Sequence, residues 1–287
     1  MKQFLFAVVV ILSVIISASF GQKTETERSW NQPVEPFKIA GNIYYVGASD
    51  VTSYLITTPK GHILLDSGLP ETVPLITANI AKLGFKMSDV KAIINSHAHY
   101  DHAGSLAELK RLTKAKLYVS EADAKLLARG GKDDPNYTDR FLFEPVTADK
   151  TFLDGWKLKL GGTTMNAMIT PGHTKGCTTW TTSVNDGGKK LNVVFVCSTS
   201  SPGYKLVGNE KYPDIATDYE NTFRRMKALK VDIFLSSHAS AYGMAEKAEK
   251  LRKGAAVNPF LDPAGYLEYL ADTEAAFRKL LDEQKAK

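Results

Sequence analysis

The chain has 287 residues, a formal net charge of +5 and 44% hydrophobic residues. This length is enough for one large domain with a full hydrophobic core, and the composition is ordinary for a globular protein. The basic residues form no run and do not alternate with aromatic residues, which argues against nucleic acid as a partner.

A targeting segment is predicted at the amino terminus, over residues 1–21. It carries a positive charge at Lys2 and a near-continuous apolar run at residues 4–16, and it ends in small residues typical of a cleavage site. The run is shorter than the roughly 20 residues of a membrane span, although an uncleaved anchor is the alternative. We therefore expect a signal peptide, export into a bacterial periplasm, and no membrane attachment after cleavage.

The next segment mixes an arm, strands and a helix. Residues 22–36 are polar and contain two prolines, which predicts an irregular arm, and its Trp30 either packs on the domain surface or borders a cleft. Three alternating or apolar segments then predict a strand meander, at residues 39–46, 51–57 and 62–66. Asp66 ends this meander, and residues 71–83 predict an amphipathic helix.

Four potential metal ligands fall within six positions directly after a predicted buried strand at residues 90–94. Helix-like sequence follows, so the ligands would sit on a strand-to-helix turn that is rigid but open to substrate. His97 and His99 are two apart and could reach one ion, while Asp101 and His102 could turn toward a second ion beside it. Imidazole and carboxylate groups suit a borderline cation such as zinc.

The distribution of histidines supports a metal site over a polar loop with unrelated histidines. The chain has only six, and three of them lie in this motif. His173 and His238 each follow a predicted strand end, in segments of similar character. Only His62 is left, and its place at the start of a strand predicts a structural role. Clustered His and Asp at ligand spacing are seldom structural, and we expect Asp66 to brace the metal-binding turn by hydrogen bonding.

The rest of the chain alternates strands with helices, which by pattern alone predicts a mixed α/β domain. Strands are predicted at residues 116–119, 157–160, 163–169, 178–184, 191–197 and 232–235. Helices are predicted at residues 105–112, 121–128, 215–229, 241–253 and 263–285, and a loop at residues 130–139.

The segment His97-Ala98-His99-Tyr100-Asp101-His102 matches the HxHxDH signature of the metallo-β-lactamase superfamily. Residues 170–176 and 236–238 resemble that superfamily's later metal-ligand segments, in the right order. The resemblance covers nearly all of the mature chain and implies one αββα sandwich domain over residues 22–287, with two Zn²⁺ ions at the edge between the sheets. The first zinc would be held by His97, His99 and His173, and the second by Asp101, His102 and His238.

Within the superfamily the sequence resembles subclass B3. Glyoxalase II and many lactonases carry an Asp that bridges both metals, whereas residues 195–204 contain no Asp or Glu. His102 also separates the chain from subclass B1, which has Arg there and a Cys ligand. Ser198 and Ser200 match serines that hold the substrate carboxylate in subclass B3, and hydroxyls are apt partners for that group. The alternative for both serines is a polar loop that satisfies its own backbone.

The resemblance implies a monomeric, periplasmic, zinc-dependent β-lactamase that opens the ring amide of penicillins, cephalosporins and carbapenems, and so confers antibiotic resistance. A zinc-bound hydroxide would attack the carbonyl carbon, and Asp101 would bind metal and orient this nucleophile. The alternative is a related hydrolase of lactones, thioesters or phosphoesters. A non-catalytic metal-binding domain is disfavoured, because such a domain has no need of an open dinuclear site.

Cys177 and Cys197 are the only cysteines, and they are predicted near the base of one hairpin. They could form a disulfide after export or remain buried thiols, and Cys197 as a zinc ligand is the minority alternative. Because neighbouring residues of a strand point to opposite sides, Ser198 in the cleft predicts that Cys197 faces away. Tyr100 is expected to line the cleft or to pack beside it, and Lys205 to add charge near the serines or to face solvent.

Overall fold

Two β-sheets stacked face to face form the centre of the protein, whose computed structural model describes residues 24–287. The signal sequence expected at residues 1–21 lies outside the described residues. The first sheet has seven strands, in the order β1 (Phe37–Ala40), β2 (Ile43–Tyr45), β3 (Tyr54–Ile56), β4 (His62–Leu65), β5 (Val90–Ile94), β6 (Lys116–Ser120) and β7 (Lys150–Phe152). The second sheet has five, in the order β12 (Ile233–Ser236), β11 (Lys189–Val196), β10 (Thr178–Asp186), β9 (Thr163–Ile169) and β8 (Lys157–Leu160).

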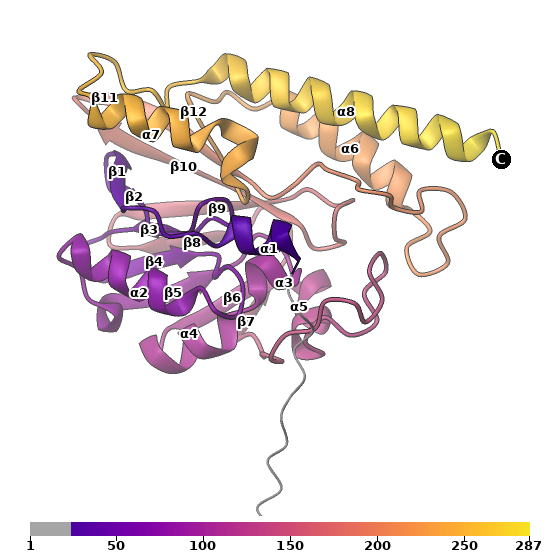
Figure 1. Cartoon of the computed structure of the whole chain (residues 1–287), viewed down its shortest axis with the longest axis horizontal. Coiled ribbons are helices and arrows are strands. Elements are labelled where there is room, and N and C mark those ends of the chain that lie inside the picture. Colours follow the sequence, from indigo (N-terminus) through magenta and orange to yellow (C-terminus); the bar gives the residue numbers. More distant parts are fainter. Residues whose placement is uncertain (1–23) are drawn as a thin grey trace, which may run out of the picture.

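Helices cover the outer faces of both sheets. Within the described residues the α-helices are α1 (Glu25–Trp30), α2 (Val73–Lys82), α3 (Tyr100–Ala103), α4 (Leu106–Thr113), α5 (Glu121–Ala128), α6 (Ile215–Lys227), α7 (Met244–Arg252) and α8 (Pro263–Lys285). Two 3₁₀ turns accompany them, η1 (Met87–Asp89) and η2 (Ala239–Tyr242). Figure 1 shows α6, α7 and α8 outside the second sheet and α2 and α4 outside the first. This arrangement confirms the predicted αββα sandwich.

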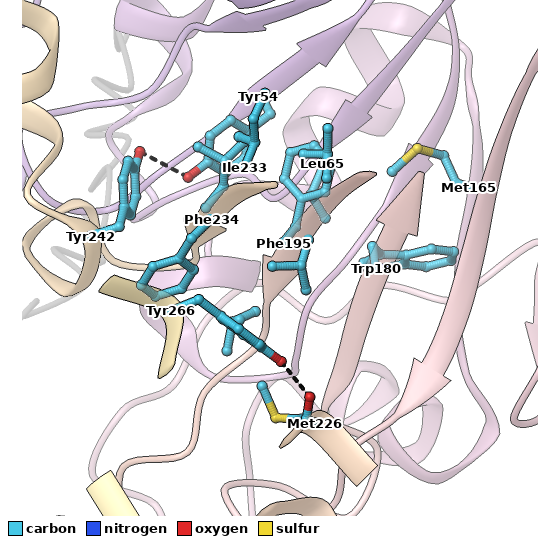
Figure 2. Close-up of a cluster of buried hydrophobic side chains, with 14 of the residues drawn as sticks. Tyr54, Leu65, Met165, Trp180, Phe195, Met226, Ile233, Phe234, Tyr242 and Tyr266 are labelled. Atoms are coloured by element: carbon cyan, nitrogen blue, oxygen red, sulfur yellow. Dashed lines mark hydrogen bonds between the residues drawn. The ribbon is translucent and has the colours of Figure 1, made fainter. Parts of the chain in front are cut away.

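The space between the sheets is filled by large side chains. Tyr54 and Leu65 enter it from the first sheet and Trp180 and Phe195 from the second, each at most 2% exposed. Figure 2 shows these residues meeting between the sheets. Replacing one such buried aromatic by alanine typically costs about 3–5 kcal/mol of stability. This shared core holds the two sheets in a fixed relation, and the edge between them is therefore a rigid place for a site.

The strands that precede the predicted site end at the same edge of the sandwich. β9 and β11 are both antiparallel to β10, and β12 is parallel to β11, so these three strands run in one direction. The first sheet meets them there, because Thr178 N–H donates to Ser96 O over 2.8 Å and Trp180 Nε1–H donates to Asn95 O over 3.1 Å. The loops after β5, β9, β11 and β12 consequently converge.

Three local predictions were wrong. The arm predicted as irregular contains α1, which begins with a capping box between Thr24 and Glu27; the short polar helix lacks the apolar periodicity that signals a buried face. Residues 39–46 form the two strands β1 and β2, because Gly41 takes a positive φ of 51° and turns the chain. Strand β7 was missed, since it has only three residues and two are exposed. Among residues 24–287 no helix is both long and apolar enough to cross a bilayer.

Candidate metal centre

The structure brings the six predicted ligands together at the common edge of the two sheets. The loop after β5 and the helix α3 carry four of them, and the loops after β9 and β12 carry one each: His97, His99, Asp101, His102, His173 and His238. Four elements, β5, α3, β9 and β12, thus fix these side chains. His238 is separated from the other five ligands by more than 60 residues of sequence.

The first group consists of three buried imidazoles. One ring nitrogen from each of His97, His99 and His173 lies within 4.8 Å of the others. His99 Nδ1 and His173 Nε2 are 3.1 Å apart, and His97 Nε2 has no hydrogen-bond partner among residues 24–287 although it is buried. A buried ring nitrogen without a partner is costly in an apolar protein interior, and a cation would remove that cost.

The second group is a close triangle of donor atoms. His102 Nε2 lies 3.2 Å from His238 Nε2, and each of these nitrogens lies 3.3 Å from Asp101 Oδ2. Ligands of a tetrahedral zinc, at bond lengths of about 2.0–2.1 Å, are separated by about 3.3 Å. The donor set and its spacing therefore fit one such ion, and the neighbouring imidazole group fits a second.

Two of the imidazoles are oriented by hydrogen bonds from the nitrogen that faces away from the centre. His238 Nδ1–H donates to Asp50 Oδ2 over 2.8 Å, and His173 Nδ1–H donates to the carbonyl of Ser200 over 2.8 Å. Such bonds fix the ring tautomer and turn Nε2 toward the metal position. Asp50 also accepts a bond from Ser240 N–H over 2.7 Å, which holds the carboxylate itself.

The other imidazoles have similar neighbours. Asp134 Oδ2 lies 3.4 Å from His99 Nε2, and Ser96 Oγ lies 3.0 Å from His97 Nδ1. Asp66 Oδ2 lies 4.0 Å from His102 Nδ1. Each ligand ring therefore has a polar atom on its outer side, which leaves the opposite nitrogen for a metal.

Asp66 braces the metal-binding turn, as predicted. Its Oδ1 accepts hydrogen bonds from Ser96 N–H over 2.6 Å and from Asn95 Nδ2–H over 2.9 Å. The carboxylate is fully buried, and this burial raises its pKa to about 6 despite the opposing effect of His102. These bonds tie the end of β4 to the loop after β5, so the turn cannot move independently of the sheet.

Asp123 is a second brace, and the sequence did not reveal it. Its Oδ2 accepts from Ala98 N–H over 3.0 Å and from Thr174 Oγ1–H over 2.8 Å, and its Oδ1 accepts from Gly176 N–H over 2.8 Å. A side chain at position 176 would collide with Ser120 and Asp123, which explains why glycine is required there. One buried carboxylate thus joins the loop of His97 and His99 to the loop of His173.

The electrostatics of the cluster favour the protonation state that a metal ligand needs at His97, His173 and Asp101, whereas at His238 they favour a proton. Burial lowers the pKa of His173 to about 3 and that of His97 well below its usual value, so both rings are neutral. Burial opposes ionisation of Asp101, but His102 and His238 outweigh it and hold its pKa well below the usual range. Burial also opposes the charge of His238, yet Asp101 and Asp50 raise its pKa to about 10. A cation at this position would replace that proton.

A cavity of about 560 Å³ opens in front of the two groups, a size suited to a drug-sized ligand. Trp30 lines it and packs edge-on against His238, with ring centroids 5.4 Å apart, so Trp30 borders the cleft. Tyr100 also lines it, stacks on Phe141 at 4.7 Å and donates a hydrogen bond to Glu27. The arm and α1 are therefore a wall of the site.

Ser198 and Ser200 both line this cavity. Their hydroxyl oxygens are 3.1 Å apart, and Ser200 N–H donates to Ser198 Oγ over 3.2 Å. The pair is close enough to share one carboxylate of a ligand. Lys205 is exposed and is not among the residues that line the cavity.

His62 lies outside the metal centre. Its ring accepts a hydrogen bond from Thr58 N–H over 3.3 Å, which is the structural role predicted for it.

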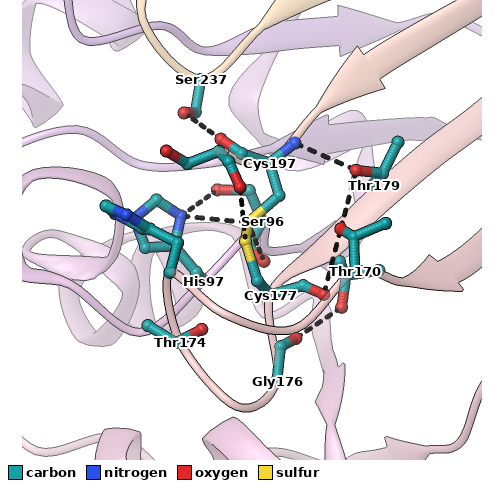
Figure 3. Close-up of a disulfide and its surroundings, with 12 residues drawn as sticks. Ser96, His97, Thr170, Thr174, Gly176, Cys177, Thr179, Cys197 and Ser237 are labelled. Atoms are coloured by element: carbon teal, nitrogen blue, oxygen red, sulfur yellow. Dashed lines mark hydrogen bonds between the residues drawn. A yellow bond between two sulfur atoms is a disulfide. The ribbon is translucent and has the colours of Figure 1, made fainter. Parts of the chain in front are cut away.

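Cys177 and Cys197 form a disulfide that lies directly behind the first group of imidazoles. Figure 3 shows it beside His97, and Cys197 Sγ is 3.5 Å from His97 Nδ1. Both sulfurs are fully buried and bonded to each other, so neither offers a thiolate. The alternative of Cys197 as a zinc ligand is therefore wrong for this form of the protein. Ser198 lines the cavity and Cys197 does not, which agrees with the prediction that these neighbours face opposite sides.

Asp50, Asp123 and Asp134 are functional candidates that the sequence reading missed. Asp50 falls between two predicted strands, Asp123 in the first turn of a predicted helix and Asp134 in a predicted loop. Aspartates are common at all three kinds of position. Each acts on a histidine or loop distant in the sequence, and nothing local to the residue carries that information.

A family model described as "Metallo-beta-lactamase superfamily" matches residues 46–238, which is more than half of the chain. The αββα fold and the clustered histidines agree with this match, and the chain belongs to the metallo-β-lactamase superfamily. It is accordingly an enzyme of a hydrolase superfamily, and its site is built for metal ions.

Solved structures narrow the resemblance to one subclass. The native FEZ-1 metallo-β-lactamase from Legionella gormanii is 45% identical, with a TM-score of 0.88, over 90% of this chain and 99% of that one. BJP-1, a subclass B3 metallo-β-lactamase of Bradyrhizobium japonicum, is 40% identical, with a TM-score of 0.85, over 90% and 98%. The chain thus resembles subclass B3 enzymes over nearly the whole of their length.

More distant similarity extends to other hydrolases. A hydroxyacylglutathione hydrolase of Rhodopseudomonas palustris is 29% identical over 127 residues, which cover 44% of this chain and 41% of that protein. This match spans about two fifths of the relative's length, so it supports shared ancestry of the metal-binding part and leaves the substrate to be decided by the site.

Proposed function

We propose that this protein is a dizinc β-lactamase that hydrolyses the ring amide of penicillins, cephalosporins and carbapenems. The observation that carries the proposal is the second group of donors, His102, His238 and Asp101, whose atoms are spaced 3.2–3.3 Å apart as around one zinc. It adjoins the group around His97 and opens on a cavity that contains two serine hydroxyls. The 40% and 45% identity to metallo-β-lactamases supports the same substrate class.

In this proposal one ion is held by His97, His99 and His173, and the other by Asp101, His102 and His238. Bound zinc would supply a water of lowered pKa, from about 15.7 to about 7, and a Lewis acid for the carbonyl oxygen. The protein's own part is to position ligands and substrate. Asp50, Asp66, Asp123 and Asp134 fix the imidazoles and their loops, which keeps the two donor groups at their spacing before any ion binds.

Asp101 is the catalytic residue in this scheme. Its Oδ2 faces His102 and His238, so Oδ1 remains to accept a hydrogen bond from the attacking water and to orient it. Ser198 and Ser200 donate hydrogen bonds to the carboxylate of the substrate, which holds the ring amide over the centre. Trp30 and Tyr100 form an aromatic wall that excludes water from one side of the cleft.

The surroundings of the enzyme also belong to the proposal. The signal sequence at residues 1–21 would direct export and be removed, which leaves residues 22–287 as one monomeric periplasmic domain. An oxidising periplasm agrees with the disulfide between Cys177 and Cys197. β-Lactams act on targets outside the cytoplasm, so this compartment is where hydrolysis would protect the cell.

Hydrolysis of a thioester is the second candidate, because of the 29% identity to a hydroxyacylglutathione hydrolase. The segment that follows β11 argues against it. Residues 195–204 offer hydroxyl groups but no Asp or Glu, whereas glyoxalase II enzymes place there an acid that bridges both metals.

A chromogenic cephalosporin tests the proposal. Purified protein should hydrolyse it, lose activity on dialysis against a chelator and regain activity with added zinc. Clavulanate should not inhibit, because the scheme involves no serine nucleophile and no acyl-enzyme. Zinc-loaded protein that cleaves thioesters or lactones but no β-lactam would overturn the proposal.

A further inference from the structure

The loop between α5 and β7 forms a wall of the cavity and contains none of the six metal ligands. It is held by its own backbone, because Asp134 N–H donates to Thr138 O over 3.1 Å and Thr138 N–H donates to Asp134 O over 3.0 Å. Arg140 N–H then donates to Tyr137 O over 3.1 Å. Asp134 lies 3.4 Å from His99 and fastens the loop to the metal centre, so a side chain on the loop has a defined position relative to the reaction.

Arg140 is placed in this loop by a stack of three groups. Its guanidinium lies over the Phe141 ring at 4.9 Å, and Phe141 stacks on Tyr100 at 4.7 Å with the planes only 5° apart. Within residues 24–287 the guanidinium has no ion pair and donates no side-chain hydrogen bond. The guanidinium is thus positioned over an aromatic ring. Its N–H groups remain available, and they form the fork that binds a carboxylate in bidentate fashion.

Arg140 also brings a positive side-chain charge to the cavity. Among the described residues that line the cavity it is the only Arg or Lys. Ser198 and Ser200 line the cavity from a different element, the loop after β11. A ligand whose ring carboxylate binds the serines therefore has a second position for an anion on a different loop of the same cavity, and the 560 Å³ cavity is large enough for one substrate to reach both.

We propose that Arg140 is a specificity-determining residue that binds a carboxylate on the acyl side chain of the substrate, so that dianionic penicillins are preferred over monoanionic ones. This inference rests on the proposed β-lactamase function. It adds a second anion position to the one at the serines, and it predicts a preference that the metal centre alone would not produce.

Three penicillins isolate this interaction, because they differ only at one side-chain carbon. Benzylpenicillin carries hydrogen there, carbenicillin a carboxylate and ampicillin an ammonium group. The measurement is kcat/KM for each substrate with the zinc-loaded wild type, Arg140→Gln, Arg140→Lys and Lys132→Gln. Lys132 is an exposed cation of the same loop that does not line the cavity, so it controls for long-range charge.

The expected result is a change in substrate ratios. In Arg140→Gln the carbenicillin-to-benzylpenicillin ratio should fall about five- to tenfold, as for one charge-assisted contact at a partly open site. The ampicillin-to-benzylpenicillin ratio should rise about twofold, because a repulsion is removed. Arg140→Lys should restore part of the carbenicillin preference, Lys132→Gln should leave both ratios unchanged, and added salt should weaken the wild-type preference.

Several outcomes would overturn the inference. An equal fall in kcat/KM for all three penicillins in Arg140→Gln would mean that Arg140 supports the loop or holds the ring carboxylate instead. Unchanged ratios would mean that it faces solvent. If the wild type turns over no penicillin, the proposed function fails. The inference is then decided by the binding of the same penicillins. Tryptophan fluorescence follows this binding, because Trp30 lines the cavity. Equal affinity of the wild type for benzylpenicillin and carbenicillin would contradict the inference.

Discussion

Asp50 and His238 are 188 residues apart in the sequence, yet His238 Nδ1–H donates a hydrogen bond to Asp50 Oδ2 over 2.8 Å. Burial opposes the charge of Asp50, but His238 and Ser240 N–H outweigh it and lower the pKa of Asp50 to about 2. A permanent anion behind the imidazole orients Nε2 toward Asp101 and His102 and raises the basicity of the ring. The second metal position thus depends on a residue in a turn between β2 and β3.

Asp50→Asn should weaken binding of the second zinc about ten- to hundredfold while the first zinc is retained. The reason is that an amide keeps the shape of the carboxylate but not its charge. Zinc titration against a competing fluorescent chelator measures both affinities. Asp214→Asn, which removes an exposed acid at the start of α6, is the control. Two unchanged affinities, or loss of the first zinc alone, would disprove this role.

Asp123→Ala should lower the free energy of unfolding by about 3 kcal/mol, because a buried carboxylate and three hydrogen bonds are lost. Urea unfolding of the metal-free protein measures this without interference from zinc. Ser120→Ala removes only the cap of the same helix and should cost about 1 kcal/mol. A loss in Asp123→Ala no larger than in Ser120→Ala would show that Asp123 does not join the two ligand loops.

The ligands that could be found in the sequence were those with a local signal. The segment from His97 to His102 combines four ligand types in six positions, and His173 and His238 each follow a strand end. Strand ends are where residues remote in sequence meet at a sheet edge. This is why the ligand set could be predicted from the residues, whereas the αββα sandwich was implied by the resemblance to the metallo-β-lactamase superfamily and the pattern alone predicted only a mixed α/β domain.

The residues that could not be found in the sequence act through contacts with segments that are distant in the chain. Asp50, Asp123 and Asp134 each contact a loop or ring whose place depends on how the sheets pack, and no spacing along the chain encodes that contact. Helix α1 is a related case. This short helix has no apolar face that a sequence pattern would reveal. Its last residue, Trp30, packs on His238. The pairing of Cys177 with Cys197 likewise needed the hairpin register, which the sequence leaves open.

Ser198→Ala and Ser200→Ala should each raise KM with little change in kcat, if both hydroxyls hold the substrate carboxylate equally in the ground and transition states. The expected loss is about 1 kcal/mol for each, or somewhat more because the acceptor is charged. Steady-state kinetics with benzylpenicillin measure it. Ser183→Ala, which removes an exposed hydroxyl outside the cavity, is the control, and unchanged KM in the double serine variant would remove the assignment.

The Cys177→Ser, Cys197→Ser double variant should keep two zinc ions per chain, because neither sulfur is a ligand. It should lose about 3 kcal/mol of stability, as expected for opening a loop with a sequence separation of 20 residues. His102→Ala should do the reverse at the metal centre and retain only one zinc. Atomic emission after dialysis gives the metal content. A double variant with one zinc, together with a His102→Ala protein with two, would reverse the assignment of the second site.

The most direct measurement compares three substrates on the same zinc-loaded protein: benzylpenicillin, a hydroxyacylglutathione thioester and an acyl homoserine lactone. The site has two donor groups, two serines and no acidic residue in the 195–204 segment. It therefore predicts that kcat/KM for benzylpenicillin exceeds the other two by about a hundredfold, which is about 2.7 kcal/mol of transition-state stabilisation. A higher kcat/KM for the thioester or the lactone would contradict the assignment of this protein as a β-lactamase.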